Sequence, residues 1–169
     1  MKTDHGDLRK LLIEELASRL LEPWLKKGFG LVSLGSDEKG AELETAFPLG
    51  RLKKDRNGDI EIIEVQFDKY GAARFVINFG IVPKEGVELP WGQHLDRHQA
   101  DASALPEAYR LYRRPFLDGW FGLNFFSPKG RDAVKSIVDT AIGISSEMEE
   151  WFRSKAVGRH MKRFGMHGG

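Results

Sequence analysis

The sequence of 169 residues contains no cysteine. This absence excludes disulfide frameworks, thiol nucleophiles, iron–sulfur clusters and cysteine-ligated zinc sites. No window approaches the roughly 18 uninterrupted apolar residues of a membrane-spanning helix, so we expect no membrane segment. The first residues carry acids and bases throughout and lack a small-residue cleavage site, which does not fit a signal peptide. We therefore expect a cytoplasmic protein.

Recognisable catalytic motifs are also missing. Gly28-Phe29-Gly30 precedes a segment with strand character, and no glycine-rich phosphate loop or Walker pattern occurs. No serine stands in a nucleophile-elbow sequence. The sequence therefore predicts no cofactor and favours a binding module over an enzyme.

Acidic and basic residues are nearly equal in number over the whole chain, but basic residues are concentrated near its C-terminal end. The chain has 26 basic and 25 acidic residues, which argues against a surface that binds polyanions all over. After Trp151 come five basic residues and no acid, namely Arg153, Lys155, Arg159, Lys162 and Arg163. We interpret residues 155–169 as a flexible basic tail. A nucleic-acid clamp is disfavoured, because only Phe164 interrupts the basic run.

The remaining chain reads as one domain over residues 8–154. Leucines at spacings of three and four predict an amphipathic helix over residues 8–25, capped by Asp4, kinked near Leu21 by Pro23 and ended by Gly28. A second helix is predicted from Ser127-Pro128 to about Ser154. Between them lie four segments with strand character, at residues 29–34, 41–49, 60–68 and 73–82.

Short turns between these segments predict an antiparallel meander. Asn57-Gly58 is typical of a tight hairpin, and Lys69-Tyr70-Gly71 supplies a second turn. Ile60 and Ile62 are out of phase with Ile63 and Val65, which suggests a bulge or a twist near Ile62. We expect one or two further strands within residues 108–126. The fold class is therefore α+β, with a meander of about four or five strands packed on one face by the N-terminal and C-terminal helices.

The order of these elements resembles a bacterial family of domains of unknown function, numbered forty-three zero four. The resemblance covers about residues 8 to 153 and is strongest in Leu25-Lys26-Lys27-Gly28-Phe29, Val65-Gln66-Phe67 and residues 75–81. It continues through Gln93-His94-Leu95-Asp96-Arg97, Trp120 and Trp151-Phe152. The resemblance implies an α+β fold and a bacterial source, and it implies no catalytic residue.

One histidine cluster could carry chemistry. If residues 93–100 are helical, His94 and His98 share a face at a spacing usable by two metal ligands, and Asp101 lies on the next turn. The pair lacks the glutamate that a zinc protease uses as its general base. A metal-assisted hydrolase or transferase that uses His94, Asp96, His98 and Asp101 is the alternative reading, and a solvated polar turn is the preferred one.

Two other groups of residues suggest binding. Glu64, Gln66 and Asn78 project from adjacent strands on the side opposite Phe67, Phe75 and Phe79, where amides could recognise a partner's backbone or a small polar ligand. Aromatic and arginine side chains gather between residues 91 and 126, and such mixtures are typical of interfaces. We therefore predict a module that binds a protein partner, while its oligomeric state stays open. The candidate binding residues are Gln66, Asn78, Trp91, Tyr109, Arg110, Tyr112, Arg113, Arg114 and Trp120.

Overall fold

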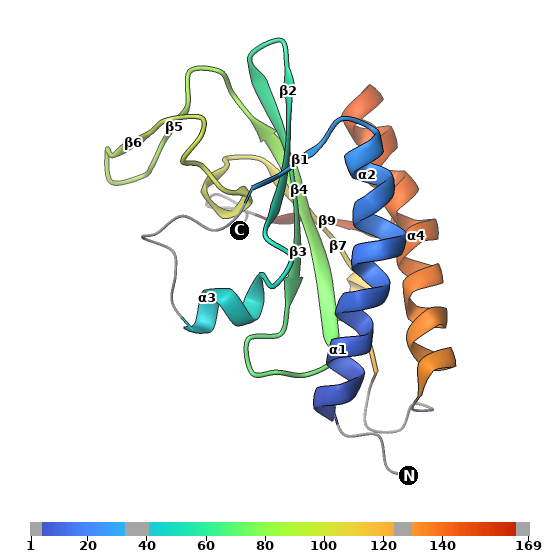
Figure 1. Cartoon of the computed structure of the whole chain (residues 1–169). Helices are drawn as coiled ribbons and strands as arrows, with labels where there is room; N and C mark the ends of the chain where they lie inside the picture. The colour runs from blue at the N-terminus through green and yellow to red at the C-terminus, as the bar shows by residue number, and fades with distance from the viewer. Residues whose placement is uncertain (1–4, 33–40, 124–129, 165–169) are drawn as a thin grey trace.

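A computed structural model of the chain describes residues 5–32, 41–123 and 130–164, and its two main helical segments lie on one side of an antiparallel sheet (Figure 1). The predicted α+β class and the two packing helices are confirmed. Asp4 and Ser127-Pro128, predicted to cap the two helices, lie outside the described residues. No helix within the described ranges is long and apolar enough to cross a membrane.

The N-terminal helical segment is interrupted as the sequence predicts. It consists of α1 (His5–Leu16), the π-helical turn η1 (Ala17–Leu21) and α2 (Glu22–Lys26). The widened turn comes just before Pro23, which cannot donate a backbone N–H to the preceding turn. Gly28 ends the segment with φ +100°, a conformation that residues with a Cβ rarely adopt.

Within the described residues, seven strands form the main sheet. Its order is β1-β2-β3-β4-β7-β9, and β8 pairs with β4 at the same edge as β7. The first four are β1 (Gly30–Val32), β2 (Arg51–Arg56), β3 (Asp59–Phe67) and β4 (Arg74–Val82), and they form an antiparallel meander in which β1, β3 and β4 fall in predicted strand segments. The others are β7 (Ala108–Leu111), β8 (Phe121–Gly122) and β9 (Met161–Phe164).

The main core lies between the sheet and the helices α1 and α4 (Arg131–Ser154). Phe75, Ile77 and Phe79 of β4 are fully buried there with Leu16 and Val138. The predicted helix-facing side of the sheet is therefore confirmed. Phe79 makes ring contacts with Tyr109, Trp151 and Phe152, which join the sheet to the end of α4.

The opposite face of the sheet carries a second, smaller core at one end. Ile60, Ile62 and Val82 pack there with Leu105, which follows the short helix η3 (Ala102–Ala104). A Cβ on Gly80 would lie 2.6 Å from a methyl carbon of Leu105, so this glycine lets the loop approach the sheet. Of the predicted bulge or twist near Ile62, the bulge does not occur, because β3 and β4 pair without interruption from Ile60–Val82 to Phe67–Phe75. Ile60 and Ile62 are apolar because this core covers them.

Two segments differ from the sequence prediction. Residues 41–49 were expected to form a strand, but Ala41–Ala46 form the helix α3, consistent with the high helix propensity of Ala, Glu and Leu. The charged segment Arg51–Arg56, for which the sequence predicts no strand, is the strand β2, which pairs with both β1 and β3. The Asn57-Gly58 turn follows it and confirms the hairpin.

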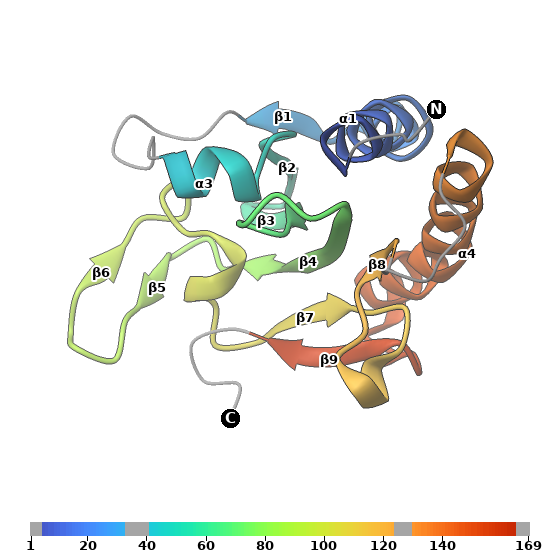
Figure 2. The same cartoon turned by 90° about the horizontal axis from the view of Figure 1, so that it is seen from below.

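The beginning of the expected basic tail also has regular structure. Met161–Phe164 form β9, which pairs along the whole of β7 and makes the edge of the sheet (Figure 2). The carboxylate of Glu147 on α4 accepts a hydrogen bond from the backbone N–H of His160 at 2.9 Å and contacts its ring. These contacts fix the strand against the rest of the fold.

Candidate functional site

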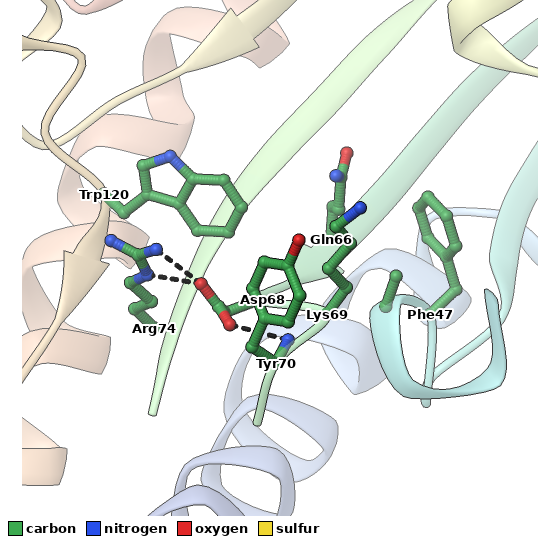
Figure 3. Close-up of a pocket in the computed structure, with 8 residues that line it drawn as sticks. Phe47, Gln66, Asp68, Lys69, Tyr70, Arg74 and Trp120 are labelled. Atoms are coloured by element: carbon green, nitrogen blue, oxygen red, sulfur yellow. Dashed lines mark hydrogen bonds and ion pairs between the residues drawn. The ribbon is translucent and has the colours of Figure 1, made fainter. Parts of the chain in front are cut away.

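Three adjoining cavities form a groove that includes the polar part of the sheet face opposite α1 and α4. The largest, the aromatic cavity, has a volume of about 400 Å³ and is lined by Phe47, Gln66, Asp68, Lys69, Tyr70, Arg74 and Trp120 with Ala46 (Figure 3). The amide cavity, of about 250 Å³, shares Phe47 and Gln66 with it. The arginine cavity, of about 300 Å³, shares Arg74 and Trp120 with it.

The aromatic cavity is built around the turn between β3 and β4. Asp68 accepts a hydrogen bond from the backbone N–H of Tyr70 at 2.8 Å and two from the Arg74 guanidinium at 2.8 and 2.5 Å. Arg74 in turn lies over the Trp120 ring, 5.1 Å from its centroid. Burial disfavours the charged carboxylate, but these hydrogen bonds outweigh it and lower the pKa of Asp68. The Arg74 charge is therefore neutralised within the protein.

The amide cavity lies over one cross-strand row of the sheet. In this row Arg51 of β2, Glu64 of β3, Asn78 of β4 and Arg110 of β7 are direct neighbours. Glu64 and Asn78 are only 2 % and 1 % exposed, so these two side chains lie at the base of the cavity, whereas Gln66 and Arg110 are half-buried. Side chains from η3 and β9 complete the cavity, namely Asp101, Ser103 and Phe164.

Glu64 and Arg51 form a buried ion pair in this row. Arg51 Nε donates to Glu64 Oε2 at 2.5 Å, and Arg51 Nη2 lies 3.5 Å from Asp101 Oδ2. Burial raises the pKa of Glu64 to about 7, because the desolvation of its carboxylate outweighs the attraction of Arg51 and the nearby charge of Asp101 adds to the increase. The cavity therefore contains a carboxyl group that titrates near neutral pH.

Arg110 is held in a different way. Its Nε donates to Asn78 Oδ1 at 2.6 Å, and its Nη2 donates to Gln66 Oε1 at 2.9 Å. Asn78 Nδ2 also donates to Gln66 Oε1 at 2.8 Å, so the three polar side chains form a closed triangle. Both acceptors are neutral amides. Arg110 makes no ion pair with any other residue in the described ranges.

The groove brings together six of the nine candidate binding residues from the sequence. Gln66, Asn78 and Arg110 line the amide cavity, while Arg113, Arg114 and Trp120 line the arginine cavity. The other three, Trp91, Tyr109 and Tyr112, do not line these cavities. Trp91 is an exposed side chain on the loop between β5 (Val87–Glu88) and β6 (His94–Leu95). Tyr109 belongs to the helix-facing core, and Tyr112 is 8 % exposed next to Arg110.

The histidine segment is not helical, so the spacing argument for a metal site does not apply. His94 lies in β6 and contacts Glu88 at 2.6 Å, whereas Asp96 accepts a hydrogen bond from the backbone N–H of His98. Asp101 caps η3 and faces Arg51. Across the described ranges, no three side chains of His, Asp or Glu are placed so that they could hold a metal ion.

Sequence reasoning missed several lining residues. No element is predicted for Arg51, and Phe164 falls in the predicted flexible tail. Phe47 and Tyr70 carry no motif or periodic signal that would place them in a groove, whereas Arg74 shares the strand alternation that places Asn78 on this face. The alternation of Glu64, Gln66 and Asp68 along one strand, with Asn78 on its neighbour, was the one signal that pointed to this face.

The fold and the groove define an α+β protein with a polar and aromatic cleft on one side of its sheet. The chain belongs to the family described as Domain of unknown function (DUF4304), which matches residues 51–150. Apart from Phe47 and Phe164, the residues that line the amide cavity lie within this span. Comparisons with curated proteins and with solved structures found no match.

Proposed function

We propose that this chain is a non-enzymatic binding module that holds an extended, acidic segment of a protein partner in the groove. The observation that carries the proposal is that the three cavities share lining residues. Through Phe47 and Gln66 on one side, and Arg74 and Trp120 on the other, the polar sheet face joins the region of aromatic and arginine side chains.

The charge of the groove supports an acidic partner. Among the described residues that line the groove, three are acids, namely Glu64, Asp68 and Asp101, and each faces an arginine of the groove. Six described lining residues are basic, namely Arg51, Lys69, Arg74, Arg110, Arg113 and Arg114. The chain as a whole has a formal net charge of only +1, so positive charge is concentrated here. Such complementarity favours encounter with an acidic segment and selects against basic ones.

The aromatic cavity supports binding of a side chain from the same segment. Tyr70 is 85 % exposed, and Trp120 and Phe47 face the same space from opposite sides (Figure 3). Trp, Tyr and Arg are the residues most enriched at binding hot spots. An extended segment could therefore place one apolar side chain among these rings and its acidic side chains in the flanking cavities.

A protein partner fits these observations better than a nucleic acid. The groove has the neutral amides of Gln66 and Asn78 beside the buried carboxylate of Glu64, whereas nucleic-acid sites need a basic track along a phosphate backbone. As part of the proposal we keep the setting that the sequence favours, the cytoplasm of a bacterial cell.

Selection from a random peptide display library on the immobilised full chain tests the proposal. We expect enriched peptides that combine Asp or Glu with one large apolar side chain. Their affinity should fall by about tenfold or more in Trp120→Ala and stay unchanged in Trp91→Ala, a matched tryptophan outside the groove. Failure to enrich acidic peptides, equal loss in both variants, or tighter binding of a single-stranded oligonucleotide would overturn it.

A further inference from the structure

Arg110 is positioned in the amide cavity, and no described residue neutralises its charge. A guanidinium has five N–H donors. Two of them bond the neutral oxygens of Asn78 and Gln66, and no described residue accepts from the other three. The used donors, on Nε and Nη2, lie on one edge of the guanidinium. The second edge, formed by Nη1 and Nη2, is the one that binds a carboxylate through two parallel hydrogen bonds.

Packing fixes the plane of this guanidinium. Arg110 Cζ lies over the Phe164 ring at 4.0 Å from its centroid and 5.9 Å from the centroid of Tyr112. A long side chain held by two hydrogen bonds and a ring loses little further conformational freedom when a ligand binds. Arg110 is therefore organised in advance for a planar anion.

The other charges of the cavity do not satisfy Arg110. Arg51 lies between Glu64 and Asp101, and its ion pairs account for both carboxylates. Gln66 adds a further donor, because its amide nitrogen has no acceptor among the described residues. The raised pKa of Glu64 reduces the negative charge of the cavity at neutral pH still further.

We infer that the amide cavity is a carboxylate subsite, in which Arg110 and the Gln66 amide receive an acidic group of the bound segment. This inference rests on the proposed function and names the chemistry of its central contact. The carboxylate could belong to an Asp or Glu side chain or to a chain terminus, and both sources present the same planar anion.

Gln66→Glu is the sharpest test, because it places a carboxylate of nearly the same shape beside Arg110. Gln66 accepts hydrogen bonds from Arg110 and Asn78 through Oε1, and a glutamate oxygen can accept both. We expect Gln66→Glu to keep its melting temperature and to bind a selected acidic peptide about tenfold or more weakly than the unaltered chain. Arg153→Glu is the control for net charge, because Arg153 lies on an exposed part of α4. This variant makes the net charge more negative than Gln66→Glu does, but it should leave the affinity for the peptide within about twofold.

A double-mutant cycle identifies the contact. Replacing the acidic residue of an amidated peptide with its amide should weaken binding to the unaltered chain by about tenfold, and to Arg110→Met by less than about twofold. If the carboxylate is instead the C-terminus of the peptide, amidation of that terminus should weaken binding to the unaltered chain more than it weakens binding to Arg110→Met. The inference would be overturned if each of these two changes to the peptide weakened binding to the unaltered chain and to Arg110→Met equally.

Sodium propionate separates failure of this inference from failure of the proposed function. We expect propionate to shift the NMR signals of the Arg110 side chain saturably in the unaltered chain and to leave those signals unmoved in Gln66→Glu. If it does so while no peptide binds, the subsite stands and the peptide proposal fails. If acidic peptides bind the groove but propionate does not move Arg110 and the cycle shows no coupling, the subsite fails and the peptide proposal stands.

Discussion

The guanidinium of Arg110 lies over the ring of Phe164, with its Cζ 4.0 Å from the ring centroid. Arg110 belongs to β7 and Phe164 to β9, which are separated by the whole of α4 in sequence and are paired in the sheet. The C-terminal strand therefore contributes a wall of the groove as well as an edge of the sheet.

Removal of this ring should weaken ligand binding. An arginine over an aromatic face is stabilised by about 0.5 to 2 kcal/mol, so Phe164→Ala should lower the affinity for an acidic peptide roughly 2- to 30-fold. Phe164→Leu is the matched control for bulk, because it keeps apolar volume but lacks the ring. Calorimetric titration of the three proteins measures the effect. Full affinity in Phe164→Ala would show that the ring does not organise Arg110.

The buried Glu64 should make stability depend on pH. Its pKa is about 7 in the folded protein against 4.5 for an ordinary glutamate. Between these values the unfolded chain has released this proton while the folded chain retains it, so the free energy of unfolding should fall as pH rises from about 4.5 to 7. The contribution of Glu64 to this fall is up to about 3 kcal/mol.

Urea denaturation at pH 5, 6, 7 and 8 can isolate this contribution. We expect the stability of the unaltered chain to decrease relative to Glu64→Gln over this range, because glutamine does not titrate. Parallel pH profiles for the two proteins would mean that Glu64 is ionised throughout and that Arg51 compensates fully for its burial.

Phe79 should be among the most sensitive positions of the main core. It is fully buried against Tyr109, Trp151 and Phe152, so Phe79→Ala should cost about 3 to 5 kcal/mol in the free energy of unfolding. Phe116→Ala is a matched control, because Phe116 is 93 % exposed and its loss should cost less than about 0.5 kcal/mol. Similar costs at the two positions would contradict the assignment of the sheet faces.

Zinc should have little effect on folding stability. His94 contacts Glu88 and lies in a short strand, so this segment offers no set of ligands that binds only in the native state. The melting temperature should therefore stay nearly constant when zinc is added. A large zinc-dependent increase that disappears in His94→Ala would restore the metal hypothesis.

The parts of the fold that the sequence could predict have strong local signals. Apolar residues at helical spacing predicted the N-terminal helix and much of α4, and alternation predicted the buried side of β4. The charged strand β2 has no such pattern, because its pairing with β1 and β3 comes from the sheet and not from its own side chains. The strand β9 also lacks such a pattern, because its place in the sheet comes from its pairing with β7. Its basic residues predict a solvated tail instead.

The candidate site was predictable only in part for a similar reason. Gln66 and Asn78 could be placed on one face by strand alternation and by the turn between their strands. That Arg110 joins them depends on β7 pairing with β4 across a loop of 25 residues between Val82 and Ala108, and no local pattern fixes that register. The burial of Glu64 depends on η3, which packs against β3 from a distant part of the chain.

Mapping of a selected acidic peptide by amide chemical shifts tests the central claim most directly. We expect the largest shifts at Gln66, Asn78 and Arg110 and around Tyr70 and Trp120, with little change in α1 and in the helix-facing side of α4. Shifts concentrated on those helices, or on the loop between β5 and β6, would place the binding surface elsewhere and contradict the groove as the site of partner recognition.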